Sequence, residues 1–94
     1  MASDVEELGV DYSEDGVELV KQLDKVVLSK GAWATVLYRY QDWDRQKGEY
    51  GPDKYTIRRY QKRNGVYQQK SKFNISSADQ ARKLVQALEQ WIGE

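Results

Sequence analysis

The sequence predicts an α+β fold in which four strands form a curved antiparallel sheet and one amphipathic helix follows them, in the order ββββα. Three observations lead to this prediction. Segments rich in β-branched and aromatic residues recur between turn-forming residues, as is typical of strands. An Asn64-Gly65 pair separates two of these segments and favours a tight hairpin turn. The C-terminal residues instead carry apolar side chains at helical spacing.

Charge divides the chain into two predicted parts, an acidic flexible tail at residues 1–16 and a single ββββα domain at residues 17–94. The tail is polar and has no sustained apolar period. Residues 1–24 contain eight carboxylates and one lysine, whereas residues 54–73 contain seven Lys and Arg and no carboxylate. The formal net charge of zero hides this division. Such a tail either contacts a basic surface or serves only as a solubiliser, and both readings stay open.

The first two strands are expected from Val17 to about Ser29 and over residues 33–42. Apolar residues alternate in VELVKQL, a β-branched run follows, and the Lys30-Gly31 turn closes the first strand. The second segment, WATVLYRYQD, is rich in β-branched and aromatic residues. Residues 43–53 form a loop that contains the only proline, Pro52, whose missing N–H makes it unwelcome in a central strand.

The third and fourth strands flank the Asn64-Gly65 turn, and a two-residue loop fixes their predicted register. Arg63 then faces Val66, and Arg59 faces Lys70. One surface of this hairpin is dominated by basic residues, namely Arg59, Arg63, Lys70 and Lys72. The other surface is the better candidate to pack inward and contains Tyr60, Tyr67, Phe73 and Ile75.

The final element is predicted to be a helix that begins after Ser77 and ends before Gly93. Ser77 and Gln80 match a capping box, and Asp79 suits the positive end of the helix dipole. The apolar residues recur on one stripe, which we expect to be buried as ordinary core: Ala81, Leu84, Val85, Leu88, Trp91 and Ile92.

Composition argues against several classes of function. Without cysteine or histidine the chain lacks disulfides, thiolate chemistry and the commonest general base and metal ligand. We therefore predict no catalytic residues, no metal and no cofactor, and an enzyme is the weakest option. No apolar run approaches membrane-spanning length and the N-terminus is acidic, so we expect a soluble cytoplasmic protein without a membrane partner. A chain of 94 residues builds a small core, which makes homodimerisation a reasonable expectation.

The basic, aromatic hairpin is the strongest functional signal, because phosphates attract cations and unpaired bases stack on flat rings. The predicted opposition of Arg59 and Lys70 also favours an anionic ligand, since facing like charges repel. A solvated basic face, or tyrosines that serve only as core, are the structural alternatives. The candidate binding residues in this reading are Arg39, Tyr40, Tyr55, Arg58, Arg59, Lys62, Arg63, Lys70 and Lys72.

The run KVVLSKGAWATVLYRYQDWD, residues 25–44, resembles the positive cofactor four family of transcriptional coactivators, with the plant Whirly proteins as wider relatives. A Gly/Pro loop, further strands and one amphipathic helix follow this run, as in that family. The resemblance implies a curved antiparallel sheet backed by a helix, a homodimer, and single-stranded DNA held on basic and aromatic strand residues. The positions that would line this groove are Arg39, Tyr40, Trp43, Arg58, Arg59, Lys70 and Lys72.

The function predicted from the sequence is therefore binding of single-stranded nucleic acid, with DNA expected, without base-specific readout and in a transcription-associated role. DNA and RNA are not separated by these residues, because both offer phosphates and stackable bases. The alternative is a protein-interaction module that docks an acidic partner on the basic sheet. If the acidic tail screens the hairpin, deletion of residues 1–16 is expected to tighten binding.

Overall fold

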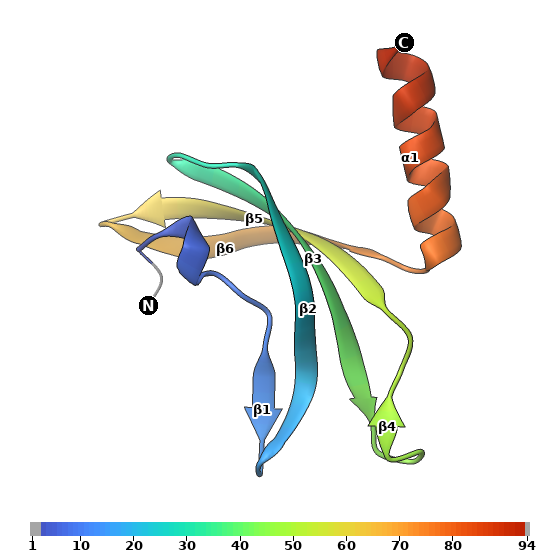
Figure 1. Ribbon diagram of the computed structural model, residues 1–94. Helices are drawn as coiled ribbons and strands as arrows, with labels where there is room; N and C mark the ends of the chain where they lie inside the picture. The colour runs from blue at the N-terminus through green and yellow to red at the C-terminus, as the bar shows by residue number, and fades with distance from the viewer. Residues whose placement is uncertain (1–2, 94) are drawn as a thin grey trace.

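The computed structural model describes residues 3–93 and consists of a curled antiparallel sheet followed by one helix (Figure 1). The four predicted strands are present as β2 (Val17–Ser29), β3 (Trp33–Asp44), β5 (Lys54–Arg63) and β6 (Val66–Ile75). The sheet also contains β1 (Tyr12–Glu14) and β4 (Glu49–Tyr50), so the predicted strand number is corrected from four to six. The order is β1-β2-β3-β5-β6, with β4 paired to β3. Strands of two or three residues carry no readable alternation, which is why the sequence did not predict them.

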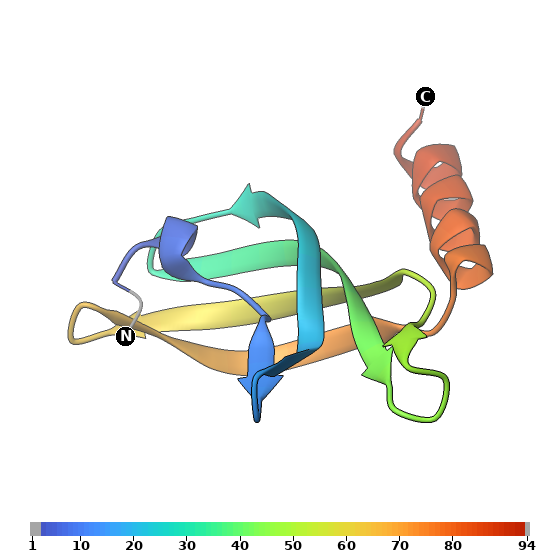
Figure 2. The ribbon, with the colours of Figure 1, turned by 60° about the horizontal axis from the view of Figure 1, so that its bottom comes forward.

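The curl of the sheet has a local cause in β2, where the pairing with β3 shifts at two places, between Gln22 and Asp24 and between Val27 and Ser29. Each shift is a bulge, and bulges bend a strand and increase its twist. Figure 2 shows β2 turned steeply across the direction of the β5–β6 hairpin, whereas the first half of β3 runs alongside β5. The sheet therefore has an inner face, which the N-terminal residues cover, and an outer face.

The β5–β6 hairpin turns at Asn64 and Gly65, which both have positive φ angles of 52° and 78° as a type I′ turn requires. Near the turn the predicted register is confirmed, with Arg63 opposite Val66. A bulge at Lys70 then shifts the pairing by one residue. Arg59 consequently faces Ser71, not Lys70 as predicted from the unbroken register.

The core lies on the inner face around Val36 and Tyr38 of β3, both of which are fully buried. Tyr60 of β5 joins them, and its hydroxyl lies 2.9 Å from the hydroxyl of Tyr38. Tyr67 packs against this cluster, as predicted. Phe73 does not, because the bulge places it opposite Ile57 on the outer face, where it is 53% exposed.

The N-terminal residues differ from the expected flexible tail. Residues 3–10, here called the N-terminal strap, include a 3₁₀ turn, η1 (Val5–Glu7), and contribute three buried side chains to the core: Val5, Leu8 and Val10. These apolar residues are too few and too irregularly spaced to stand out among the surrounding carboxylates. Residues 1 and 2 of the predicted tail lie outside the described residues.

The strap is also held by polar contacts. Nζ of Lys25 donates hydrogen bonds to the carbonyl oxygens of Val5, Glu6 and Leu8 at 2.7, 3.1 and 2.7 Å. The Gln22 side chain accepts a 3.0 Å hydrogen bond from the backbone N–H of Val10. Strand β1 then pairs with β2 through a turn at Asp15 and Gly16.

The helix α1 (Ala78–Ile92) begins and ends as predicted. The Ser77 hydroxyl accepts a hydrogen bond from the backbone N–H of Gln80, and Gly93 ends the helix with a φ of 110°. Figure 1 shows α1 projecting away from the sheet. None of its residues is buried, and Trp91 and Ile92 are 80% and 83% exposed, so the predicted burial of its apolar stripe is not found within this chain. At 15 residues α1 does not meet the length of a membrane-spanning helix, and residues 3–93 contain no other helix that does.

Candidate nucleic-acid interface

Six cationic residues of β5 and β6, here called the hairpin cations, form the candidate interface: Arg58, Arg59, Lys62, Arg63, Lys70 and Lys72. Among residues 3–93, none of the six lies within 4.0 Å of a carboxylate oxygen. Lys54, at the start of β5, does have such a partner, because Nζ lies 2.7 Å from Asp42 and this hydrogen bond raises the lysine pKa. The hairpin cations therefore differ from Lys54 in having no carboxylate partner among the described residues.

Three hairpin cations belong to the inner face, where Arg58 directly faces Lys72 across the strand pair. Arg58 alternates along β5 with the buried residues Thr56 and Tyr60, which fixes its side. One guanidinium nitrogen, Nη1, donates to the Gln69 side chain at 3.2 Å. Its Nε is buried and has no hydrogen-bond partner among the described residues. Because this nitrogen is closed to a ligand, it is the facing of Arg58 and Lys72 that would make an anion favourable here.

Lys62 continues the same face toward the hairpin turn and has an aromatic neighbour. Its Nζ lies 5.2 Å from the centroid of the Tyr67 ring, which is a cation–π distance. The Tyr67 hydroxyl donates a 2.7 Å hydrogen bond to the carbonyl of Gly31, so the ring is fixed in place.

The outer face of the hairpin carries Arg59 and Arg63, two residues apart on β5. The guanidinium of Arg59 lies over the ring of Trp33, 4.5 Å from its centroid. Trp33 is partly exposed and is the first residue of β3, opposite Gln61. Sequence reasoning did not select Trp33, although its position after the Lys30-Gly31 turn places it beside the hairpin tip. Lys70 occupies the bulge between the paired residues.

Two other predicted site residues of the second half of β3 lie apart from the hairpin cations. Arg39 is exposed but lies between two carboxylates, 4.0 Å from Asp24 and 3.5 Å from Asp53. Its charge is therefore compensated in a way that those of the hairpin cations are not. Tyr40 is half-buried and packs against the inner core.

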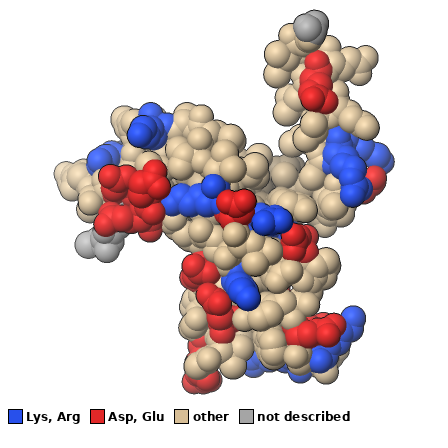
Figure 3. All heavy atoms as spheres, viewed as in Figure 1, with Lys and Arg blue, Asp and Glu red and all other residues tan. Residues whose placement is uncertain are grey.

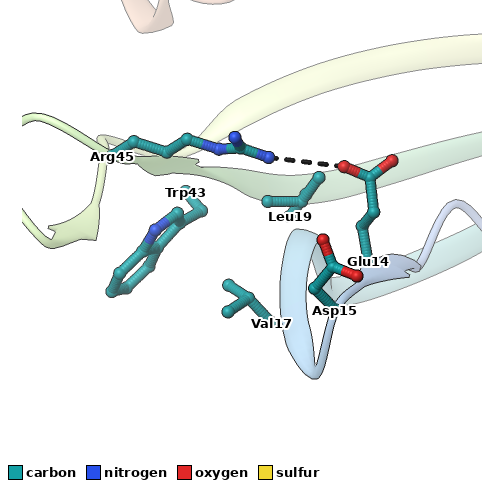
Figure 4. A pocket seen from close by; sticks show the side chains of 6 residues that line it. All are labelled: Glu14, Asp15, Val17, Leu19, Trp43 and Arg45. Carbon is teal, nitrogen blue, oxygen red and sulfur yellow. Dashed lines mark hydrogen bonds and ion pairs between the residues drawn. The ribbon is translucent and has the colours of Figure 1, made fainter.

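Trp43 lies near the end of β3 that is far from the hairpin turn, in an acidic environment. Its ring makes an edge-to-face contact with Tyr50 at 5.0 Å. Figure 4 shows Trp43 beside Val17 and Leu19 in an open hollow of about 360 Å³, where Arg45 and Glu14 form a 3.4 Å ion pair. Trp43 is thus not brought together with the hairpin cations.

Tyr55, the remaining predicted site residue, lies on the outer face, in an apolar hollow between the sheet and α1. This hollow has a volume of about 270 Å³ and only apolar or aromatic residues line it: Leu28, Leu37, Tyr55, Ile57, Ile75, Ala81, Leu84, Val85 and Leu88. Tyr55 therefore belongs to an apolar surface and not to the cationic one. Ile75, predicted to pack inward, is buried in this outer hollow.

No grouping of three or more acidic side chains suited to a metal ion occurs in the described part of the chain. No family model, curated protein or solved structure matches this chain. The geometry of the hairpin cations is consequently the main basis for assigning a function.

Proposed function

We propose that this protein binds single-stranded nucleic acid through the hairpin cations, without reading base sequence. The observation that carries the proposal is that Arg58 faces Lys72 while no carboxylate among residues 3–93 compensates either residue. Like charges directly opposite in a sheet are destabilising, and phosphate oxygens placed between them would remove that repulsion. Binding to phosphates releases counterions from the nucleic acid and needs no particular base.

Aromatic rings next to these cations support single strands as the ligand. Trp33 under Arg59 and Tyr67 beside Lys62 provide flat surfaces at the same end of the sheet. Stacking of a base on such a ring contributes about 1–3 kcal/mol, but only bases that are not already paired can use it. DNA and RNA both offer phosphates and stackable bases, and parallel titrations with a DNA strand and an RNA strand distinguish the two ligands.

The test uses a variant that removes the facing pair, Arg58→Gln with Lys72→Gln, and a matched control, Arg82→Gln with Lys47→Gln. The control loses the same charge at two exposed positions outside the hairpin. Fluorescence anisotropy of a labelled single strand is measured over a range of salt concentrations. The facing-pair variant is expected to bind more weakly and to lose about 1.4 from the slope of log affinity against log salt, about 0.7 for each phosphate contact. Equal slopes in the two variants would contradict the proposal.

A second candidate function is docking of an acidic protein segment, and one observation favours it. The acidic strap of this chain already lies on the inner face, where Lys25 holds its backbone. A competition experiment distinguishes the two functions. An unlabelled acidic peptide is added to the protein bound to a labelled single strand. The peptide displaces the strand at a concentration similar to that of an unlabelled strand only if the cations recognise polypeptide carboxylates as well as phosphates.

A homodimer is part of the same proposal, with a second copy of this chain as the occupant of the outer apolar hollow. The helix α1 offers an uncovered stripe that includes Leu84, Val85 and Leu88, and the sheet beside it offers Leu28 and Ile57. Both halves of this surface occur on the same chain, so two copies related by a twofold axis can each cover the other. This arrangement leaves the inner-face cations available to the nucleic acid.

A further inference from the structure

Asp4 of the N-terminal strap lines the same surface hollow as Lys62 of the cationic inner face, and Glu6 and Glu7 follow it in the same turn. A shallow hollow of about 340 Å³ is lined by Ser3, Asp4 and Val5 of the strap, by Lys30 and Gly31 of the turn after β2, and by Lys62 and Tyr67 of the hairpin. Figure 3 shows carboxylates gathered over the N-terminal turn, the projection at the left of that view. The strap therefore carries negative charge to the edge of the region that we assign to phosphates.

The strap is a fixed part of the core and not a removable cover. Val5, Leu8 and Val10 are buried against the inner face, and full burial of an apolar side chain of this size contributes about 1.5–3 kcal/mol. Lys25 adds three hydrogen bonds to the strap carbonyls. A ligand that displaced the strap would have to open this core, so a bound strand must lie beside it.

The carboxylates themselves point to solvent from this fixed backbone. Asp4, Glu6 and Glu7 are all exposed. Glu7 accepts hydrogen bonds from the backbone N–H groups of Ser3 and Asp4 at 2.8 and 3.1 Å, which lowers its pKa. Asp4 caps η1 by accepting a hydrogen bond from the N–H of Glu6. The turn thus presents three negative charges, and hydrogen bonds to the backbone hold the carboxylates of Asp4 and Glu7.

We infer that Asp4, Glu6 and Glu7 form an acidic wall that weakens duplex binding more than single-strand binding at the inner face. This inference rests on the proposed function and concerns how the same site discriminates between its ligands. A duplex carries one charge per about 1.7 Å of axis, twice the density of either of its strands, so it brings about twice as many phosphates within a screening length of the wall. A single strand can also bend its phosphates toward the hairpin cations while its bases face the strap.

The magnitude follows from Coulomb's law in water. One carboxylate and one phosphate about 8 Å apart change an affinity by about twofold when salt is low. Three carboxylates that each face one duplex phosphate therefore weaken duplex binding by about tenfold. A single strand places half as many phosphates near the carboxylates, so its binding is weakened by about threefold. The wall thus changes the ratio of the two affinities by about threefold.

The experiment compares the wild-type chain with the variant Asp4→Asn, Glu6→Gln, Glu7→Gln. Asparagine is a good N-cap and glutamine satisfies a capping box, so the turn is retained while its charge is removed. The affinities for one labelled thymidine 20-mer and for one labelled 20-base-pair duplex are measured at 50 mM salt. The expected result is a gain of about tenfold for duplex and about threefold for the single strand, both of which shrink as salt rises.

The control variant makes the same charge change at the far end of the sheet, with Asp15→Asn, Glu18→Gln and Glu49→Gln. Equal gains for both ligands, or the same gains in the control, would overturn the wall while leaving the proposed function standing. Failure of the wild-type chain to bind the single strand would instead overturn the proposed function. A second variant, Glu6→Lys alone, reverses one charge of the wall and should lower the preference for single strands. The turn should tolerate this change, because the Glu6 side chain makes no hydrogen bond or ion pair within residues 3–93.

Discussion

Arg58 on β5 and Lys72 on β6 are direct cross-strand partners, and the bulge at Lys70 is what brings them into register. The sequence predicts a like-charged pair in this hairpin but assigns it to Arg59 and Lys70. The bulge moves that opposition to the neighbouring residue of β5 and two residues along β6, which places it on the inner face. The fold therefore retains the repulsion between two facing cations. One of them, Arg58, also has a buried Nε atom with no hydrogen-bond partner among the described residues.

Lys72→Gln is expected to stabilise the free protein while it weakens binding. Removing one of two facing like charges should raise the free energy of unfolding by about 0.2–1 kcal/mol. The measurement is urea unfolding of the variant without nucleic acid. Lys47→Gln, in the exposed turn after β3, is the control and should change stability by less than about 0.5 kcal/mol. A loss of stability in Lys72→Gln would mean that Lys72 has a favourable structural role.

The paired hydroxyls of Tyr38 and Tyr60 predict non-additive losses of stability. Tyr60→Phe leaves the buried Tyr38 hydroxyl unpaired and should cost about 1–3 kcal/mol, and Tyr38→Phe should cost a similar amount. The double variant should cost less than the sum of the two, because no buried hydroxyl is then left without a partner. Urea unfolding of all four proteins measures the coupling, and simple additivity would show that the two hydroxyls do not interact.

The same pair predicts sensitivity to alkaline pH. Burial, and then the hydrogen bond with Tyr60, raise the pKa of the Tyr38 hydroxyl above its ordinary value near 10. The neutral phenol is favoured in the folded state, so its contribution is complete below about pH 10 and is lost as the pH rises further. Thermal unfolding between pH 8 and 11 should show this fall. In Tyr38→Phe the fall should be smaller, and an unchanged profile would contradict the assignment.

Lys25→Met is expected to loosen the N-terminal strap. The substitution removes three hydrogen bonds to strap carbonyls and should lower stability by about 1–3 kcal/mol. Amide hydrogen exchange should rise at Leu8 and Val10 more than in the β5–β6 hairpin. Lys21→Met, on the same strand but with its ammonium over Tyr50, is the comparison and should leave strap exchange unchanged. If the strap amides of Lys25→Met exchange as slowly as those of the wild-type chain, the apolar contacts of the strap are sufficient to hold it.

The exposed stripe of α1 predicts a concentration-dependent dimer. Sedimentation equilibrium should give twice the 11.0 kDa chain mass for the wild-type protein. Leu88→Ser with Trp91→Ser should shift the equilibrium toward monomer, because both side chains are exposed apolar groups within a single copy. Gln86→Ser with Gln90→Ser changes polar residues of the same helix and should preserve the dimer. A monomeric wild-type chain at high concentration would contradict the homodimer.

Local signals account for the parts of the fold that the sequence predicted. Asn64-Gly65 determines the hairpin turn, and Ser77 and Gly93 bound the helix because their backbone requirements are local. The bulge at Lys70 was not predicted, since nothing in the alternation of QQKSK marks an extra residue. The strap was not predicted because Val5, Leu8 and Val10 are buried by tertiary contacts and have no period of their own.

The candidate site was predicted in its composition but not in its division between two faces. The hairpin cations are placed together at one end of the sheet, but the bulge decides which face each one joins. Arg39 was selected from its strand position, whereas its two carboxylate neighbours come from β2 and from the loop before β5. Such pairings depend on the strand order and register, which alternation alone does not supply.

The salt dependence of wild-type binding to a labelled thymidine 20-mer tests the central claim most directly. If the three inner-face hairpin cations, Arg58, Lys62 and Lys72, each contact a phosphate, log affinity should fall linearly against log salt with a slope of about −2, from about 0.7 per contact. Binding at 50 mM salt that weakens in this way is the predicted result. The absence of binding at 50 mM salt, or an affinity independent of salt, would contradict the claim that this surface holds nucleic acid.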